Sequence, residues 1–166
     1  TNFMKDQKAI KKVYIIGQDY SFGQSVRTAA QAMLKAKRPD IQIVGDELHP
    51  LLKITDFSPY VAKIKQSGAD TVISGNWGQD LALLFKAAKD AGLDAKWYTY
   101  YAGAQGTPTA IGNALTDKIT YVYGSWVNQP GEFTAIRDAF KKKYNQDIST
   151  STIIHAIRTL SGGIAK

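Results

Sequence analysis

The chain of 166 residues contains no cysteine. Without thiols it has no disulfide framework, no thiolate nucleophile and no thiolate ligand for zinc. Histidine is scarce as well, with two in the whole sequence, and the HExxH spacing of zinc peptidases does not occur. No apolar stretch reaches the roughly 18 residues of a membrane-spanning helix. The sequence therefore predicts no metal site, no thiol chemistry and no cofactor.

The glycine patterns that bind nucleotides are also missing. A dinucleotide fold has GxGxxG after its first strand, whereas residues 17–23 read GQDYSFG. That loop has tyrosine and phenylalanine rings where the backbone would have to approach a pyrophosphate. A Walker P-loop and the GxSxG elbow of serine hydrolases are absent too. We therefore expect no catalytic residues and no enzymatic activity.

Charge is the one composition feature that stands out, with a formal value of +7 from 21 basic and 14 acidic side chains. Such an excess is typical of nucleic-acid binding when the basic residues gather in one place. Here they are spread along the chain and interleaved with Asp and Glu. The compact run Lys141–Lys143 falls late in a predicted helix, where cations suit the macrodipole. A solvated surface explains this pattern, and no nucleic-acid partner is expected.

Predicted strands and helices alternate along the sequence. Apolar runs rich in β-branched residues predict strands over 12–17, 41–48, 70–75, 96–101 and 118–126. Helical spacing of apolar residues predicts helices over 22–37, 58–68, 77–92, 130–145 and 151–166. A capping signal supports the helix over 58–68: Ser58 before Pro59 predicts that this helix begins with the serine as its N-cap. This order predicts an α/β fold, a three-layer doubly wound parallel sheet of the flavodoxin or Rossmann-like type.

Ligands of such sheets bind at the carboxyl ends of the strands. The loops there are 17–23, 74–79, 100–107 and 123–130, and they are rich in aromatic and neutral polar residues. These candidates are Asp19, Tyr20, Phe22, Asn76, Trp77, Gln79, Tyr100, Tyr101, Gln105, Thr107, Tyr123, Ser125, Trp126 and Asn128. Apolar walls with a few hydrogen-bonding groups suit a small organic ligand. The alternative for each ring is that it only covers the sheet edge.

Both histidines lie outside these loops. His49 follows a predicted strand close to two acidic residues, which on paper is an acid–base group. A partly exposed histidine beside a carboxylate is far more often structural, and we interpret His49 in that way. His155 falls inside the last predicted helix.

Several segments resemble, in order and spacing, the branched-chain amino acid receptors of ABC transporters. They read KKVYIIGQDYSFGQS, ITDFSPYVAKIKQSGADTVISG, DLALLFKAAKDAGLDAKWY and FTAIRDAFKKKYNQDIST. The most specific piece is the turn 55–58, followed about ten residues later by Gly68-Ala69-Asp70 and a strand. The chain thus resembles the second lobe of a periplasmic leucine/isoleucine/valine-type binding protein, with the type I periplasmic binding protein fold.

The resemblance implies a domain organisation and a set of partners. Residues 1–150 would form a single ligand-binding lobe, and residues 151–166 a helix that re-enters a first lobe missing from this chain. The implied partners are that first lobe, a small solute such as an amino acid or a related carboxylate or amide, and an ABC permease in the inner membrane. The implied location is the periplasm. Because the first lobe is absent, the last helix is expected to dock its apolar face on the lobe present here, to fray beyond Gly162-Gly163, or to pair with a second copy of the chain. A homodimer through this helix is the preferred expectation.

Carried over residue by residue, the resemblance implies a ligand site. Phe22 and Trp77 would be aromatic residues of the ligand cleft. Tyr101 falls where the leucine-type receptors have a glutamate that pairs with the ligand ammonium. Asp19 and Tyr20, in the first loop, complete the predicted ligand-binding set, with Asp19 as a substitute for the missing acid. Tyr101 makes amides, urea or aromatic acids more plausible solutes than leucine.

Two other functions fit the same architecture. One is an amide-sensing regulator lobe of the same fold. The other is a flavodoxin-like receiver or enzyme domain. A receiver has an acidic cluster after the first strand and a phosphoacceptor aspartate after the third, whereas the third strand here ends in SGNWG. The receiver thus has the right order of elements and the wrong residues.

Overall fold

A five-stranded parallel sheet forms the centre of the molecule. The computed structural model describes residues 1–104, 106–122, 131–146, 148 and 152–164. The strands lie in the order β2-β1-β3-β4-β5, and every neighbouring pair is parallel. Their bounds are β1 Lys12–Gln18, β2 Gln42–His49, β3 Thr71–Ser74, β4 Lys96–Thr99 and β5 Ile119–Tyr121. The predicted doubly wound α/β fold is confirmed.

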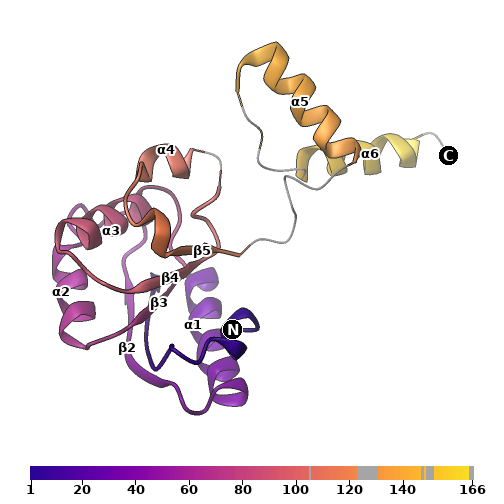
Figure 1. The fold of residues 1–166 in the computed structure, drawn as a ribbon. Coiled ribbons are helices and arrows are strands. Elements are labelled where there is room, and N and C mark those ends of the chain that lie inside the picture. Colours follow the sequence, from indigo (N-terminus) through magenta and orange to yellow (C-terminus); the bar gives the residue numbers. More distant parts are fainter. Residues whose placement is uncertain (105, 123–130, 147, 149–151, 165–166) are drawn as a thin grey trace.

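Helices follow the strands as the sequence predicts (Figure 1). They are α1 Ser21–Lys37, α2 Ser58–Gln66, α3 Gly78–Asp90, α4 Thr107–Ile111, α5 Glu132–Tyr144 and α6 Thr152–Ile164, with short 3₁₀ helices η1 Phe3–Asp6 and η2 Thr116–Lys118. The step from β1 to β2 runs the opposite way along the sheet from all later steps. Right-handed crossovers therefore place α1 on one face and α2, α3 and α4 on the other.

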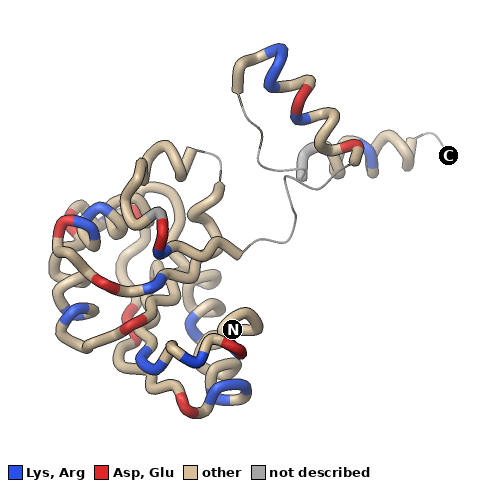
Figure 2. The backbone as a smooth tube through the Cα atoms, in the orientation of Figure 1, with Lys and Arg blue, Asp and Glu red and all other residues tan. Residues whose placement is uncertain are grey.

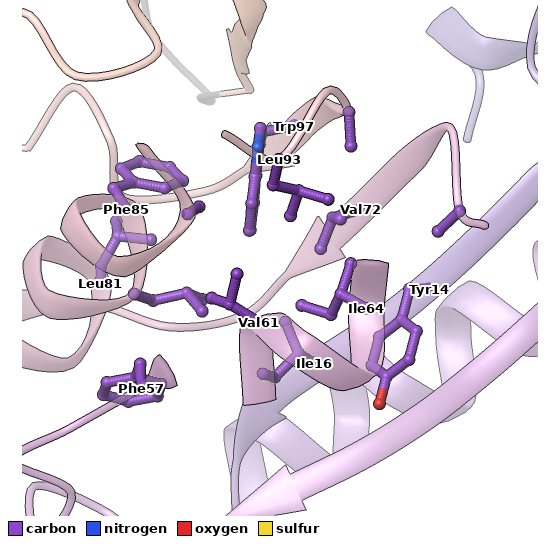
Figure 3. Packing of buried hydrophobic residues seen from close by; sticks show 14 of the residues in the cluster. Tyr14, Ile16, Phe57, Val61, Ile64, Val72, Leu81, Phe85, Leu93 and Trp97 are labelled. Carbon is purple, nitrogen blue, oxygen red and sulfur yellow. The ribbon is translucent and has the colours of Figure 1, made fainter. Parts of the chain in front are cut away.

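The face covered by α2 and α3 carries the larger core (Figure 3). Trp97 of β4 lies edge-on to Phe85 of α3, with ring centroids 5.0 Å apart, and both side chains are fully buried. Val61 and Ile64 of α2 pack into the same cluster. Each such buried side chain stabilises the fold by about 1.5–3 kcal/mol. The sheet and these two helices thus form a rigid base for the loops at the strand ends.

The opposite face carries a smaller core between α1, η1 and the strands. Alternation along β4 sends Tyr98 to this face while Trp97 points to the other. The end of α1 is fastened by Arg38, which is buried and donates to the backbone carbonyls of Met4, Gln7 and Ile10 at 2.8 Å, 3.1 Å and 3.0 Å. The amino-terminal segment is thereby held against the sheet.

The start of α2 differs by one residue from the sequence prediction. The N-cap is Phe57 and not Ser58, and the helix begins at Ser58 with Pro59 in its first turn. Asp56 takes the capping role, because its carboxylate accepts the Ser58 N–H at 2.8 Å. Hydrogen bonding from the Ser58 side chain, together with this backbone bond, lowers the pKa of Asp56. The predicted helix start is present, but the acceptor is the carboxylate of Asp56, two residues before Ser58, and not the Ser58 hydroxyl.

Charged residues are spread over the tube of the backbone, with both signs interleaved (Figure 2). Several make surface ion pairs, such as Lys63–Glu47 at 2.5 Å and Lys118–Asp94 at 2.6 Å. This distribution agrees with a solvated surface. In the described part of the chain, no helix combines the length and the apolar character that crossing a membrane requires.

Helices α5 and α6 lie apart from the sheet (Figure 1). Glu132 of α5 and Arg158 of α6 form an ion pair that joins the two helices. On α6 the side chains of Ile157, Leu160 and Ile164 are exposed, so this face is not docked on the lobe. The helix extends through its glycine pair to Ile164, and fraying beyond that pair stays a prediction. The predicted homodimer through α6 stays a prediction.

Candidate functional site

The carboxyl ends of β1, β3 and β4 meet at one edge of the sheet. A two-residue turn, Asp19-Tyr20, joins β1 to α1. The turn is tight because α1 comes very close to β1: a Cβ atom on Gly23 would lie 1.8 Å from the Gln18 carbonyl oxygen. Only glycine fits there, so this residue fixes where the first loop presents its rings.

Aromatic rings from separate loops gather above this edge. The ring centroid of Phe22 lies 5.7 Å from that of Tyr101, 6.1 Å from that of Tyr100 and 6.1 Å from that of Tyr20. These tilted and edge-on arrangements are the favourable ones for aromatic pairs. The first and third predicted loops are thus brought together by ring contacts.

Trp77 joins the second loop to the first. Its indole Nε1–H donates to the Tyr20 hydroxyl at 2.8 Å. Because an indole nitrogen only donates, the Tyr20 oxygen is the acceptor in this bond. The hydroxyl proton of Tyr20 is then left to donate elsewhere. Tyr20 therefore combines a fixed position with a hydroxyl proton that no residue in the described part of the chain accepts.

A pocket of about 290 Å³ lies between these loops. It is lined by Tyr20, Trp77, Gly78, Tyr101, Ala104 and Thr107. None of these described lining residues carries a charge. Three of the predicted site residues line the pocket, namely Tyr20, Trp77 and Tyr101. Phe22 is not part of the lining but packs against the ring of Tyr101. An uncharged pocket with aromatic walls suits a small ligand that has a polar group to accept or donate a hydrogen bond.

Asp19 is placed less favourably for a ligand role. Its side chain is exposed and accepts a hydrogen bond from Gln24 Nε2 at 2.9 Å. This side chain does not line the pocket. The backbone N–H of Asp19 donates to the His49 carbonyl at 2.7 Å, which ties the turn to the end of β2. In this structure Asp19 holds the turn and does not supply the pocket with a carboxylate.

A layer of buried polar side chains lies beneath the rings. Asp80, in the first turn of α3, is 1% exposed, and its carboxylate accepts from Gln18 Nε2 at 2.7 Å and from the Leu52 backbone N–H at 2.9 Å. Gln18 also approaches the Trp77 carbonyl at 3.4 Å. Asp80 therefore ties the end of β1, the loop after β2 and the start of α3 to one another, and it lies next to the pocket residues Trp77 and Gly78.

His49 belongs to the same layer, and the expected partial exposure is wrong, since its side chain is fully buried. It ends β2, and its ring contacts Phe57 and Tyr60 edge-on. Nδ1 lies 3.1 Å from the Pro50 carbonyl, which only accepts, so Nδ1 carries a proton. Nε2 lies 3.1 Å from Oδ1 of Asn76, whose side chain is also buried. The structural role predicted for His49 holds, but the reason is burial.

Sequence patterns gave little indication of this buried layer. Gln18 and Asp80 are 62 positions apart, so no local spacing connects them. An acidic residue in the first turn of a predicted helix indicates a helix start and says nothing of burial. Gln105 and the fourth predicted loop, with Tyr123, Ser125, Trp126 and Asn128, lie outside the described residues. Within the described ranges no cluster of His, Asp and Glu has the make-up of a metal site.

The sequence of this chain matches a known family. The periplasmic binding protein family matches residues 1–158, and the chain belongs to that family. One relative, Leu/Ile/Val-binding protein homolog 4 of Brucella abortus, is 46% identical over 112 residues, which cover 67% of this chain and 26% of the relative. A second, the leucine-, isoleucine-, valine-, threonine- and alanine-binding protein of Pseudomonas aeruginosa, is 23% identical over 99% of this chain and 44% of its own.

Solved structures give the same result. The leucine-, isoleucine-, valine-, threonine- and alanine-binding protein of Brucella ovis, in a closed conformation, is 35% identical over 87% of this chain and 37% of its own, with a TM-score of 0.70. A solute-binding protein of an ABC transporter from R. palustris, in complex with 4-hydroxybenzoate, is 32% identical over 60% of this chain and 27% of its own, with a TM-score of 0.54. The chain therefore spans between about a quarter and less than half of these relatives.

Proposed function

We propose that this chain is one lobe of an ABC-transporter solute-binding protein. It binds a small solute in the pocket between Tyr20, Trp77 and Tyr101, and a second lobe of a longer protein closes over it. The closed protein delivers the solute to a permease from the periplasm and performs no chemistry. The observation that carries this proposal is the convergence of aromatic rings from separate strand-end loops on an uncharged pocket. The names of the relatives as binding proteins support it.

The chemistry of the pocket also limits the solute. A buried ammonium group needs a carboxylate partner, because leaving it unpaired costs several kcal/mol. Tyr101 lines the pocket without a charge, and Asp19 is engaged by Gln24 outside it. Tyr20 offers a hydroxyl proton, which suits a carboxylate or carbonyl oxygen on the solute. We therefore propose an aromatic or aliphatic carboxylate or an amide, and the relative that binds 4-hydroxybenzoate supports this class.

This lobe alone is expected to bind weakly. A single lobe supplies one wall of an interlobe cleft and leaves the other side of the solute in water. Dissociation constants of about 1 mM or weaker, equivalent to about 4 kcal/mol, are expected. Submicromolar binding by the 166-residue chain would contradict the single-lobe account.

A calorimetric comparison of leucine with its deaminated analogue, 4-methylpentanoate, tests the solute class. The wild-type chain is expected to bind 4-methylpentanoate at least as well as leucine, since no pocket carboxylate favours the ammonium group. Tyr101→Glu is expected to reverse this order by adding the missing charge. Tyr100→Glu is the matched control, because Tyr100 lies beside Phe22 but outside the pocket lining. Leucine binding by the wild type with no detectable binding of 4-methylpentanoate would overturn the proposed class.

A further inference from the structure

Three hydroxyl groups line the strand-end pocket, and they differ in exposure. They belong to Tyr20, Tyr101 and Thr107. Both tyrosines are partly exposed, whereas Thr107 is 8% exposed. A partly exposed hydroxyl can keep water as a hydrogen-bond partner, but a buried one depends on groups of the protein or of a ligand. Thr107 is therefore the lining residue whose hydroxyl most needs a partner.

The backbone around Thr107 is hydrogen-bonded without help from the side chain. Thr107 is the first residue of α4 (Figure 1), and its N–H donates to the Ala104 carbonyl at 2.9 Å. Gly106, with a φ of 81°, precedes the helix, and its carbonyl accepts the Ala110 N–H at 3.0 Å. Among the described residues, none is hydrogen-bonded to the Thr107 hydroxyl. The residue is thus held in place by its backbone, and its hydroxyl is left for a group inside the pocket.

The hydroxyls of Tyr20 and Thr107 reach the pocket from different strands. Tyr20 follows β1 and Thr107 lies in the connection after β4, while β3, whose loop carries Trp77, lies between these two strands. Strands two places apart in a sheet are about 10 Å from each other. A flat ring with a polar group at each end, together with one hydrogen bond at each end, is of about this length. The strand order therefore suits a solute that has polar groups at opposite ends.

The two hydroxyls also differ in what they can bind. The Tyr20 oxygen accepts from Trp77 Nε1 at 2.8 Å, so it offers its proton to the pocket, which suits a carboxylate. The Thr107 hydroxyl can donate and accept at the same time. It matches a hydroxyl on the solute, which also does both.

We propose that Thr107 is a specificity-determining residue, whose hydroxyl selects carboxylates that carry a hydroxyl at the end opposite the acid. This inference rests on the solute site proposed above and adds a second polar contact to it. Tyr20 binds the carboxylate, Thr107 binds the far hydroxyl, and Trp77 and Tyr101 contact the body of the solute between them. A solute that lacks the far hydroxyl leaves the buried Thr107 hydroxyl without a partner, and the site binds it less tightly for that reason.

Two aromatic acids that differ by one hydroxyl test this selection. 4-Hydroxybenzoate and benzoate are titrated separately into the 166-residue chain, and the indole N–H resonance of Trp77 reports occupancy of the site. The wild type is expected to bind 4-hydroxybenzoate about 5-fold more tightly than benzoate, which is what one neutral hydrogen bond contributes. Thr107→Val removes the hydroxyl with little change of shape, and this preference is expected to disappear.

Three further variants serve as controls. Thr107→Ser keeps a hydroxyl at the same position and is expected to keep the preference. Thr109→Val makes the same chemical change on an exposed side chain outside the pocket lining, and it is expected to bind both acids as the wild type does. Tyr20→Phe removes the other hydroxyl and is expected to weaken both acids by similar factors, because both carry the carboxylate.

Failure of this inference and failure of the solute site give different results. Saturable binding of both acids with equal affinity for the wild type, or a preference that survives Thr107→Val, would overturn the role of Thr107 and leave the site in place. A preference that is lost in Tyr20→Phe but kept in Thr107→Val would overturn it too. No saturable shift of Trp77 with either acid would overturn the site itself. The comparison of the two acids on the wild type needs no variant, so it decides even where a substitution disturbs the fold.

Discussion

The two edges of the sheet carry pockets of similar volume and opposite chemistry. The carboxyl-edge pocket, of about 290 Å³, has aromatic and neutral walls. The amino-edge pocket, of about 260 Å³, is lined by charged residues of both signs together with small apolar ones. Its charged residues are Asp70, Asp94, Lys96, Asp117 and Lys118. Volume therefore does not distinguish a binding site here; the partners of the polar groups do.

At the amino edge the charges hold chain connections together. The Asp70 carboxylate accepts from the backbone N–H groups of Lys11 and Lys12 at 2.9 Å and 2.8 Å, which fixes the start of β1. Lys118 pairs with Asp94 at 2.6 Å. At the carboxyl edge the buried polar layer of Gln18 and Asp80 holds the chain connections together below the surface. The aromatic rings above this layer are therefore not needed for that purpose and can contact a solute. At the carboxyl edge, then, the polar groups that hold the fold together are buried, and the polar groups that line the pocket are separate from them.

Removing the buried carboxylate is expected to have the largest effect. Asp80→Ala leaves Gln18 Nε2 and the Leu52 N–H without their acceptor in a buried region. A loss of about 3 kcal/mol in the free energy of unfolding is expected, since unsatisfied buried donors cost about 1–3 kcal/mol each. Urea unfolding measures it. Asp90→Ala, on the exposed end of the same helix, is the control, with a change within about 0.5 kcal/mol.

A smaller loss is expected from the corresponding change at the amino edge. Asp70→Ala removes the acceptor of two backbone N–H groups, but Lys11 and Lys12 are exposed and water replaces part of the lost bonding. A loss of about 1–2 kcal/mol is expected in the same unfolding measurement. Asp94→Ala, whose carboxylate is 91% exposed, should change stability by about 0.5 kcal/mol or less. If Asp70→Ala proves more damaging than Asp80→Ala, the comparison of the two edges fails.

The smallest effect is expected in the acid range and involves Asp40. Arg38 donates to both carboxylate oxygens of Asp40, at 2.7 Å and 2.8 Å, and these hydrogen bonds hold the pKa of Asp40 below its ordinary value of 3.8. A carboxyl group whose pKa is lower in the folded state stabilises the fold at pH values above its ordinary pKa. This contribution is lost as the pH falls through the lowered pKa of the folded state. Asp40→Asn should therefore lose less stability than the wild type when the pH is lowered from about 5 to about 2. Parallel pH curves for the two proteins would refute this.

Much of the fold could be predicted from the sequence. Each strand from β1 to β5 overlaps a predicted run, because buried parallel strands are short, apolar and rich in β-branched residues. The loop rings could be predicted as well: Tyr20, Trp77 and Tyr101 follow three strands whose carboxyl ends share one edge, and they line one pocket. Their role in binding a solute stays a prediction.

The remainder depends on contacts between distant residues. His49 is buried because the rings of Phe57 and Tyr60 pack against it. Asp80 is held by hydrogen bonds from Gln18 and from the backbone N–H of Leu52. Periodicity reports the face of an element and carries no information about which polar group meets which. The spacing of apolar residues on α5 predicts a buried face, but it does not say which surface buries that face.

The central claim, that a solute binds at the carboxyl edge, is tested most directly by NMR of the indole N–H groups. The Trp77 indole lies in the site, bonded to Tyr20, whereas the Trp97 indole is buried in the core without a hydrogen-bond partner among the described residues. Trp126→Phe removes the third tryptophan signal and completes the assignment. Titration with 4-hydroxybenzoate to millimolar concentration is expected to shift the Trp77 resonance in a saturable way and to leave Trp97 in place. An unmoved Trp77 resonance, or saturable shifts confined to the backbone amides of the amino-edge residues Thr71 and Lys96 in the same titration, would contradict the account.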